Sequence, residues 1–386
     1  MSGDHRGIEL RLAFFYAALF SLVGVHLPFW PVWLKAHGLG PTEIGVVLAV
    51  GVGVKVIANP LVAAFADRLG QRRPIMIALS LLALMTFSLF AWTGGFWGIL
   101  GVTVLFFAAW SPIMPLGESL TMLAGGGREL DYGRIRASGS LAFIVTAVGA
   151  GYLLTGRPAD TVFWAILAMM AVATLATLAL PATSTAPAAG GRRALAEVWR
   201  DGRFRLFLLA ASLIQASHAV YYAFGTLDWQ AAGHSERVIG WLWAEGVIAE
   251  IILFAVGARL VRLTGPGLLI ALGGAAGAVR WALTGMTDAL PALVALQALH
   301  AFTFGATHLG AIYFIARRFP AAVSASAQSL YSAMVMGLGL GLASLLAGKL
   351  YGLYGGGAYW AMAAVALLGG LAGALLVNDR EREKIV

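Results

Sequence analysis

Long apolar segments are the feature that most restricts how this chain can fold. A helix needs about 20 mostly apolar residues to cross the hydrocarbon core of a bilayer, and segments of that kind follow one another along the whole sequence. Hydrophobic residues make up 60% of the chain and charged residues only 11%, whereas a soluble domain carries about 25% charged residues. The sequence therefore predicts an all-α polytopic membrane protein with twelve transmembrane helices. The predicted spans are 10–34, 42–66, 74–93, 96–123, 133–155, 159–180, 204–231, 236–262, 265–286, 289–316, 319–347 and 355–377.

The basic residues indicate how these spans are oriented. If both termini lie in the cytoplasm, most of the 26 lysines and arginines fall in cytoplasmic segments, as the positive-inside rule requires. This distribution explains the net charge of +8 without a nucleic-acid partner. We expect a multi-pass protein of the bacterial inner (plasma) membrane with cytoplasmic termini. The predicted outer loops hold Lys35, Arg157, Arg237 and Lys349, and the spans themselves hold Lys55, Arg136 and Arg280.

One long polar connection divides the chain into two halves. We expect an N-terminal six-helix bundle at 1–180, a cytoplasmic linker at 181–203, a C-terminal six-helix bundle at 204–377 and a cytoplasmic tail at 378–386. Two six-helix repeats are a known transporter design, with the substrate site between the repeats near the midplane.

Several functions are disfavoured by what the sequence lacks. It contains no cysteine, so disulfides and thiolate metal sites are excluded. Its histidines do not cluster at metal-ligand spacing, and no phosphate-binding loop or nucleophile elbow is present. The first apolar run is too long for the apolar region of a cleaved signal peptide. We therefore expect neither an enzyme nor a sensor, no metal, and no cofactor other than a proton as coupling ion.

Charged residues inside a membrane cost about 2.5–3.5 kcal/mol each on insertion scales, so each needs a partner or a wet cavity. Glu118 lies near the end of span 96–123 and Arg136 near the start of span 133–155, so the two flank one predicted hairpin turn at similar depth. We expect them to neutralise each other, either as part of a substrate site or as a purely structural ion pair. An arginine that extends to the membrane surface is a further alternative for Arg136.

A second charged group is predicted on spans 236–262 and 265–286. Glu245 and Glu250 are five residues apart, which separates them by about 140° around a helix. Only one of the two is therefore expected to line a cavity. Arg280 lies at a depth comparable to that of Glu245, and we expect these two residues to form an ion pair that is either functional or structural.

Span 289–316 carries a polar stripe that favours a cavity lining. Gln297 and His300 are three residues apart and share a helix face, and Thr303 and His308 follow them. Other candidates are less certain: Asp228 could simply be solvated near the outer surface, and Lys55 could bond to backbone carbonyls. Aromatic residues that could form flat walls are Trp110, Tyr221, Tyr222 and Trp281, and His218 adds a further polar group to the seventh span.

The segment DRLGQRR, from Asp67 to Arg73, resembles the signature loop of the major facilitator superfamily between its second and third spans. The resemblance implies the two-bundle fold of that superfamily and a gating role for Asp67, Arg68 and Arg72, which would latch the cytoplasmic side. The first glycine of the signature is replaced by Ala63.

Within the superfamily the chain is similar to the lactose-permease-like group, on the segments HLPFWPVWL (26–34), PLVAAFADRLGQRR (60–73) and DYGRIRASGS (131–140). In that group the residues matching Glu118 and Arg136 bind sugar hydroxyls, and those matching Glu245, Arg280 and His300 contact substrate and couple protons. The chain departs from the group at Thr303, where the permease has its proton-carrying glutamate, and at Met336, where it has a lysine.

A nearer resemblance is to the phenylpropionic-acid transporter-like subfamily, on SHAVYYAFGTLDWQ (217–230), GWLWAEGVIAEI (240–251) and LQALHAFTFGATHLGA (296–311). It implies a proton-coupled symporter of a small aromatic or related carboxylate that works by alternating access as a monomer. A sugar or nucleoside symporter and a multidrug efflux antiporter stay open as alternatives. The predicted proton-coupling residues are Glu118, Glu245, Glu250 and His300. The predicted substrate-binding residues are Arg136, Arg280, Lys55, Tyr221, Tyr222, Asp228, Gln297, His300, Thr303, His308 and Trp110.

Overall fold

Backbone polar groups inside a bilayer have no water to bond to, so a spanning chain satisfies them within its own helices. The computed structural model describes residues 2–125, 131–182 and 192–377, and every extended element within these ranges is a helix. This confirms the all-α class. The chain folds into two compact units, Met1–Ala189 with His234–Ala244, and Gly190–Gly233 with Glu245–Val386.

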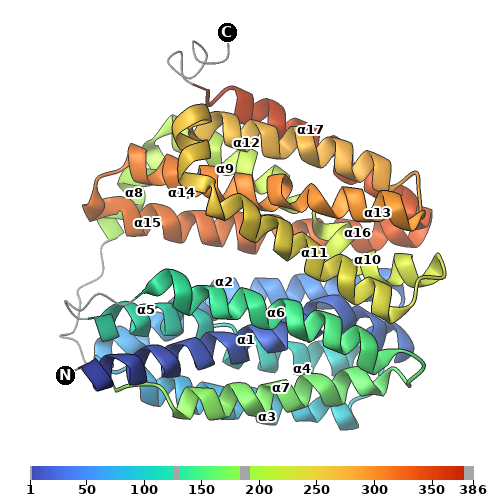
Figure 1. Cartoon of the computed structure of the whole chain (residues 1–386), viewed down its shortest axis with the longest axis horizontal. Helices are drawn as coiled ribbons and strands as arrows, with labels where there is room; N and C mark the ends of the chain where they lie inside the picture. Colours follow the sequence, from blue (N-terminus) through green and yellow to red (C-terminus); the bar gives the residue numbers. More distant parts are fainter. Residues whose placement is uncertain (1, 126–130, 183–191, 378–386) are drawn as a thin grey trace. The chain divides into compact units, whose positions relative to one another are not determined.

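The first unit contains seven helices and one 3₁₀ turn of its own, and the first half of α11 (Glu236–Ala255) belongs to it as well. In this unit α1 packs along both α6 and α7 (Figure 1). Its elements are α1 (Ser2–Ala36), α2 (Pro41–Leu69), α3 (Arg73–Ser88), η1 (Leu89–Trp92), α4 (Gly95–Trp110), α5 (Ile113–Gly125), α6 (Tyr132–Leu154) and α7 (Asp160–Leu178).

The second unit contains the remaining helices, several of which are interrupted. Two of its elements are π-helical turns, η2 and η3, in which the helix locally widens. Its elements are α8 (Arg192–Arg200), α9 (Gly202–Ala216), α10 (Ala219–Ala231), the rest of α11, α12 (Gly257–Thr284), α13 (Leu290–Ala298), η2 (Ala301–Ala306), α14 (Thr307–Arg318), α15 (Ala321–Tyr331), η3 (Ser332–Gly339), α16 (Leu340–Tyr354), η4 (Gly355–Gly357) and α17 (Ala358–Ala374).

Eleven helical stretches of the described residues are long and apolar enough to cross a membrane. The last of them, Ser326–Ala374, has 49 residues, about 74 Å of helix, which exceeds two crossings of a hydrocarbon core about 30 Å thick. Gly355 divides this stretch at η4, with a φ of 54° that suits glycine. The stretch therefore supplies two crossings, close to the predicted spans 319–347 and 355–377.

The predicted span 236–262 is too long at its C-terminal end. Helix α11 ends at Ala255, and Val256 has the non-helical angles φ −105° and ψ 3°. The next helix begins at Gly257 and bends at Gly265, where φ is 78° and ψ is 164°. The bend at Gly265 coincides with the predicted start of span 265–286, whereas the break at Val256 falls inside the predicted span 236–262. Hydropathy misses the break at Val256 because it does not register backbone angles.

Small residues bring helices of the second unit into backbone contact. A Cβ atom on Gly274 of α12 would collide with the backbone of Gly370 on α17, and one on Gly277 would lie 2.9 Å from Ala366 Cβ. Helices in lipid gain no hydrophobic driving force from pairing, so close packing of this kind supplies the attraction. The seam between α12 and α17 holds the segment of α12 that carries Arg280.

At the other end of this unit, an aspartate ties α9 to α14. Asp201 is the N-cap of α9 and accepts a hydrogen bond of 2.9 Å from the Phe204 backbone N–H. Arg318, in the last turn of α14, donates to the same carboxylate through Nε and Nη2, both at 2.8 Å. Burial raises the pKa of Asp201, but these hydrogen bonds outweigh it and hold the pKa below its usual value.

We expect Asp201→Asn to destabilise the protein by about 1 kcal/mol near neutral pH, the upper end for an exposed ion pair, because it removes the charge that Arg318 contacts. Since the folded-state pKa is lowered, the carboxylate stabilises the fold above about pH 4, its unfolded pKa, and this contribution is lost as the pH falls through the folded-state pKa. Thermal unfolding from acid to neutral pH should therefore show the difference between the two proteins shrinking in acid. Asp131→Asn, at the exposed N-cap of α6, is the control, and a pH-independent difference for Asp201→Asn would contradict the assignment.

Candidate functional site

A buried arginine organises the polar interior of the second unit. The Arg280 side chain is 0% exposed. Its Nη1 lies 3.0 Å from His300 Nδ1 and donates to Thr303 Oγ1 at 3.0 Å, and its Nη2 donates to Gln297 Oε1 at 2.7 Å. The structure thus brings together four residues that the sequence interpretation had placed in the substrate site. We call Arg280, Gln297, His300, Thr303 and His218 the Arg280 cluster.

The directions of these hydrogen bonds follow from the chemistry of the groups. A guanidinium only donates, so His300 Nδ1 accepts from Arg280. His218 Nδ1 lies 3.0 Å from the Ile214 carbonyl and therefore donates to it, which leaves Nε2, 3.0 Å from Thr303 Oγ1, to accept the hydroxyl proton. This geometry corresponds to neutral imidazoles at both histidines, and Arg280 is the cationic member of the cluster.

The charge of Arg280 has no carboxylate in contact. Among the described residues no Asp or Glu oxygen lies within 4 Å of its guanidinium, and its Nε is buried without a hydrogen-bond partner. The expected ion pair with Glu245 is therefore wrong as a direct contact. Glu245 is half-buried and interacts with Arg280 only through space. Neutral oxygen and nitrogen acceptors occupy the positions where an ion pair was predicted.

Aromatic rings cover the faces of the guanidinium. Arg280 Cζ lies 4.4 Å from the centroid of the Trp281 ring and 4.9 Å from that of Tyr221. Trp281 in turn stacks on Tyr359 of α17 at 5.8 Å, and the buried Tyr359 hydroxyl has no hydrogen-bond partner. Cation–π contacts of this kind stabilise a desolvated cation and leave flat apolar surface beside it.

Irregular backbone positions the cluster. The seventh span breaks between α9 and α10 at Ser217 and His218. There Ser217 Oγ bonds to the Ile214 carbonyl and accepts from Trp281 Nε1 at 3.0 Å. On the facing span, Thr303 lies within the π-turn η2 and His300 precedes it. Such π-bulges are common at functional sites, and here one provides Thr303 as an acceptor for Arg280, while His300 lies at its start.

The sequence interpretation gave no role to His218, Ser217 or Tyr359. His218 was visible as a polar residue in the seventh span, and its position three residues before Tyr221 was the available signal. Tyr221 belongs with the site, since its hydroxyl donates to Gln297 Oε1 at 3.3 Å. Nothing in the sequence indicates that Tyr359 reaches Trp281.

Other predicted substrate residues of this unit make different contacts. Asp228 accepts a hydrogen bond of 3.1 Å from Tyr351 on α16 and makes no hydrogen bond to the Arg280 cluster. His308 lies 3.4 Å from the Tyr331 hydroxyl through Nδ1. Tyr222 stacks on His218 with centroids 5.5 Å apart. The side chain of Glu250, on α11, lies next to Gly305 of η2.

The hairpin charges of the first unit are not in direct contact. No oxygen of Glu118 lies within 4 Å of the Arg136 guanidinium, and the two interact only through space. Arg136 instead lies over two rings of α1, 4.2 Å from the Phe20 centroid and 5.9 Å from that of Tyr16. The predicted ion pair is therefore replaced by cation–π contacts. Matching opposite charges along the sequence does not reveal such contacts.

Lys55 of α2 is the other cation inside this unit. Its Nζ lies 5.0 Å from the Phe107 ring centroid, and among the described residues it has no hydrogen bond or ion pair. The alternative of a bond to backbone carbonyls is therefore wrong. His26 also faces the Phe107 ring, and its buried Nε2 has no partner. Trp110, one turn further along α4, stacks on Phe106 at 6.3 Å.

The signature segment closes on itself and on α5. Arg72 Nη2 donates to Asp67 at 2.9 Å, and Arg72 Nε donates to Ser119 Oγ at 2.7 Å. Arg73 donates to the Leu178 carbonyl at the end of α7, whereas Arg68 is exposed. The segment therefore ties the end of α2, the start of α3 and the end of α7 to the middle of α5. Among the described residues no group of three or more His, Asp or Glu side chains is placed to hold a metal ion.

Comparison with known proteins identifies the family. The model of the MFS_1-like family matches residues 9–362. The chain belongs to the MFS_1-like family. Members of this kind are membrane transporters, so the chain is a multi-pass transporter and not an enzyme, and the resemblance seen in the sequence to the major facilitator superfamily is confirmed.

Individual relatives of this MFS_1-like chain are named for different substrates. It is 36% identical over 366 residues to a probable 3-phenylpropionic acid transporter of Escherichia coli (strain K12), which covers 92% of this chain and 94% of that one. It is 27% identical over 375 residues to a maltose permease of Geobacillus stearothermophilus, covering 95% and 94%. The crystal structure of the nucleoside transporter NupG matches with a TM-score of 0.83 at 17% identity, covering 96% of this chain and 98% of that one, which shows the fold alone.

We expect Thr303→Val to destabilise the second unit by about 1–3 kcal/mol, because it leaves a buried donor on Arg280 and a buried acceptor on His218 unsatisfied. Thermal unfolding of the purified protein measures this change. Thr303→Ser keeps the hydroxyl and should restore most of the loss. Thr264→Val, which removes a bond to a backbone carbonyl only, is the matched control. Equal stabilities for Thr303→Val and Thr264→Val would show that the hydroxyl does not bridge the cluster.

Proposed function

We propose that the chain is a proton-coupled symporter of a small organic acid, namely an aromatic or related carboxylate, and that Arg280 receives the carboxylate. The observation that carries this proposal is the state of Arg280. It is fully buried, it contacts only neutral acceptors, and its Nε is unpartnered. A buried cation without a counter-ion is costly, and an anionic substrate would supply the missing charge.

The surroundings of Arg280 support an aromatic acid. Trp281, Tyr221 and Tyr359 present rings next to the guanidinium, and offset or edge contacts with a substrate ring would use the same apolar surface. The relative with 36% identity is named a probable 3-phenylpropionic acid transporter. 3-Phenylpropionic acid has one carboxylate and one aromatic ring. The name of this relative supports the same substrate class for this chain.

The charges near the site support proton coupling. A carboxylate that binds at Arg280 adds a negative charge near Glu245, which already interacts with Arg280 through space. A proton taken up by Glu245 would keep the net charge of this low-dielectric region constant. We therefore favour Glu245 as the coupling group over Glu250, Glu118 and His300. His300 already accepts a hydrogen bond from Arg280.

We also propose a membrane location, a gating mechanism and an oligomeric state. The distribution of basic residues supports an inner-membrane location with cytoplasmic termini. Family membership supports alternating access, with Asp67, Arg68 and Arg72 as gating residues, and a monomer as the working unit. The closed network of Arg72 with Asp67 and Ser119 is the kind of contact that a latch would make and break.

A sugar or nucleoside symporter is the second candidate function. The neutral side chains of Gln297, Thr303 and His218 could bond to hydroxyls once rearranged, and a maltose permease is among the relatives. This candidate needs no negative charge on the substrate, so it predicts competition by neutral sugars or nucleosides. Multidrug efflux has no comparable support, because the directional polar network of the site suits a specific ligand.

We expect Arg280→Gln to reduce uptake of 3-phenylpropionate into proteoliposomes by about tenfold or more, since it removes the charge that the carboxylate would meet. Arg280→Lys should also fail, because a lysine cannot reproduce the fork of donors to Gln297, His300 and Thr303. Uptake of the acid and of its neutral amide under an imposed pH gradient measures the effect. Arg259→Gln, an exposed arginine on α12, is the control and should transport normally.

Two results would overturn this assignment. Equal transport of the acid and the amide would show that the protein does not recognise the substrate carboxylate. Uptake of a neutral sugar or nucleoside that 3-phenylpropionate does not inhibit would favour the second candidate instead.

We expect Glu245→Gln to separate exchange from coupling. The variant should still exchange labelled for unlabelled substrate across the membrane, because exchange needs no net proton movement. Accumulation driven by an imposed pH gradient should be lost. Glu250→Gln is the matched comparison on the same helix and should keep both activities. Retained accumulation by Glu245→Gln would transfer the coupling role to another carboxylate.

A further inference from the structure

A basic cavity lies at one end of the second unit and shares no residue with the Arg280 cluster. It has a volume of about 160 Å³ and is lined by residues of α9, α12 and α14 and by Leu376 after α17. Pockets that hold drug-sized ligands measure about 300–1,000 Å³. The cavity therefore suits a small charged group better than a transported organic solute.

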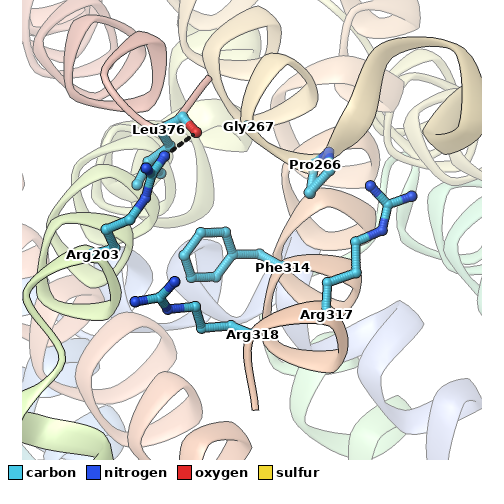
Figure 2. A pocket seen from close by; sticks show the side chains of 7 residues that line it. All are labelled: Arg203, Pro266, Gly267, Phe314, Arg317, Arg318 and Leu376. Atoms are coloured by element: carbon cyan, nitrogen blue, oxygen red, sulfur yellow. Dashed lines mark hydrogen bonds between the residues drawn. The ribbon is translucent and has the colours of Figure 1, made fainter. Parts of the chain in front are cut away.

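Three arginines from two helices surround this cavity. Arg203 comes from the first turn of α9, and Arg317 and Arg318 come from the last turn of α14. Figure 2 shows the Phe314 ring among the three side chains, with the Arg203 guanidinium bonded to the Leu376 carbonyl. The planar guanidinium fork matches the oxygens of phosphate and carboxylate groups.

A helix start provides a second positive feature in the same place. The chain bends at Gly265, and the second segment of α12 begins at Pro266, a residue that favours the first position of a helix. Pro266 and Gly267 both line the cavity. The N-terminal end of a helix carries a partial positive charge and suits phosphate groups.

The described residues do not balance this charge. Asp201 is paired with Arg318 at 2.8 Å. Arg203 donates to a neutral carbonyl at 2.8 Å, and neither Arg203 nor Arg317 has a carboxylate oxygen within 4 Å. The positive-inside rule explains why arginines occur at this end of the spans. It does not require them to converge with a helix start on one cavity.

We propose that this cavity binds a phosphate group, supplied by an anionic phospholipid of the surrounding bilayer. Basic pockets between transmembrane helices on the cytoplasmic side bind such headgroups. Phe314 and Leu376 provide apolar wall next to the arginines, where the glycerol and the first methylenes of a lipid would lie. Inorganic phosphate has the same chemistry without the apolar part, so the two sources can be told apart.

Native mass spectrometry of the full-length protein measures this binding directly. The probes are phosphatidylglycerol, which is anionic, and phosphatidylcholine, which is zwitterionic, each titrated into detergent-solubilised protein. We expect phosphatidylglycerol adducts to bind roughly tenfold or more weakly in the double variant Arg203→Gln, Arg317→Gln, since each basic residue near a lipid surface contributes to binding. The control is Arg205→Gln, Arg259→Gln, which removes two exposed arginines that do not line the cavity and should bind lipid normally.

Further arms keep the result interpretable. Arg317→Gln alone breaks no hydrogen bond among the described residues. We therefore expect this variant to fold as the parent does and to show a partial loss of lipid binding. Displacement of the lipid by inorganic phosphate in the parent, but not in the double variant, supports the site. Binding of inorganic phosphate by a parent that binds no lipid would contradict the lipid as the ligand and identify free phosphate instead. Equal lipid and phosphate binding by the parent and the double variant overturns the proposal.

Discussion

The burial of one positive charge is the constraint on which the second unit depends. Arg280 is withdrawn from water and lies in a helix that packs backbone to backbone against α17. A guanidinium in such a place must keep its donors satisfied, and Gln297, His300 and Thr303 together provide the acceptors. Because all three are neutral, hydrogen bonding is largely satisfied while the charge is not. This difference between satisfied donors and unsatisfied charge is what makes the cluster suitable for an anionic substrate.

Backbone irregularity supplies much of the precision of this site. A regular helix uses its carbonyl groups for its own ladder, so side chains along it find few free acceptors. The break at Ser217 and His218 lets the Ile214 carbonyl accept from His218 Nδ1, which fixes the tautomer that faces Thr303. The π-turn η2 places Thr303 between this histidine and Arg280. Two local departures from helical geometry therefore determine the directions of the hydrogen bonds that join His218, Thr303 and Arg280.

Much of the fold could be predicted from the sequence because the membrane imposes a length on every span. The grouping of Arg280, Gln297 and His300 in one site could also be anticipated, because the family resemblance links Arg280 with His300 and the helical spacing places Gln297 on the same face as His300. The ion pairs were the part that failed. Opposite charges at similar depth suggested Glu118 with Arg136 and Glu245 with Arg280, but rings of α1 and neutral side chains of α13 and η2 take those positions. Such contacts depend on how helices rotate against one another, and periodicity does not encode that rotation.

The glycine seam between α12 and α17 has a mechanical consequence. Where Gly274 meets Gly370 there is no side-chain layer that could shear, so these two helices form a stiff beam with Arg280 fixed on it. The acceptors of the guanidinium lie on other elements, with Gln297 on α13 and Thr303 in η2. A rearrangement around Arg280 would therefore move these acceptors relative to the α12–α17 pair. Arg280 would then keep its place on the α12–α17 pair while its neutral hydrogen-bond acceptors move.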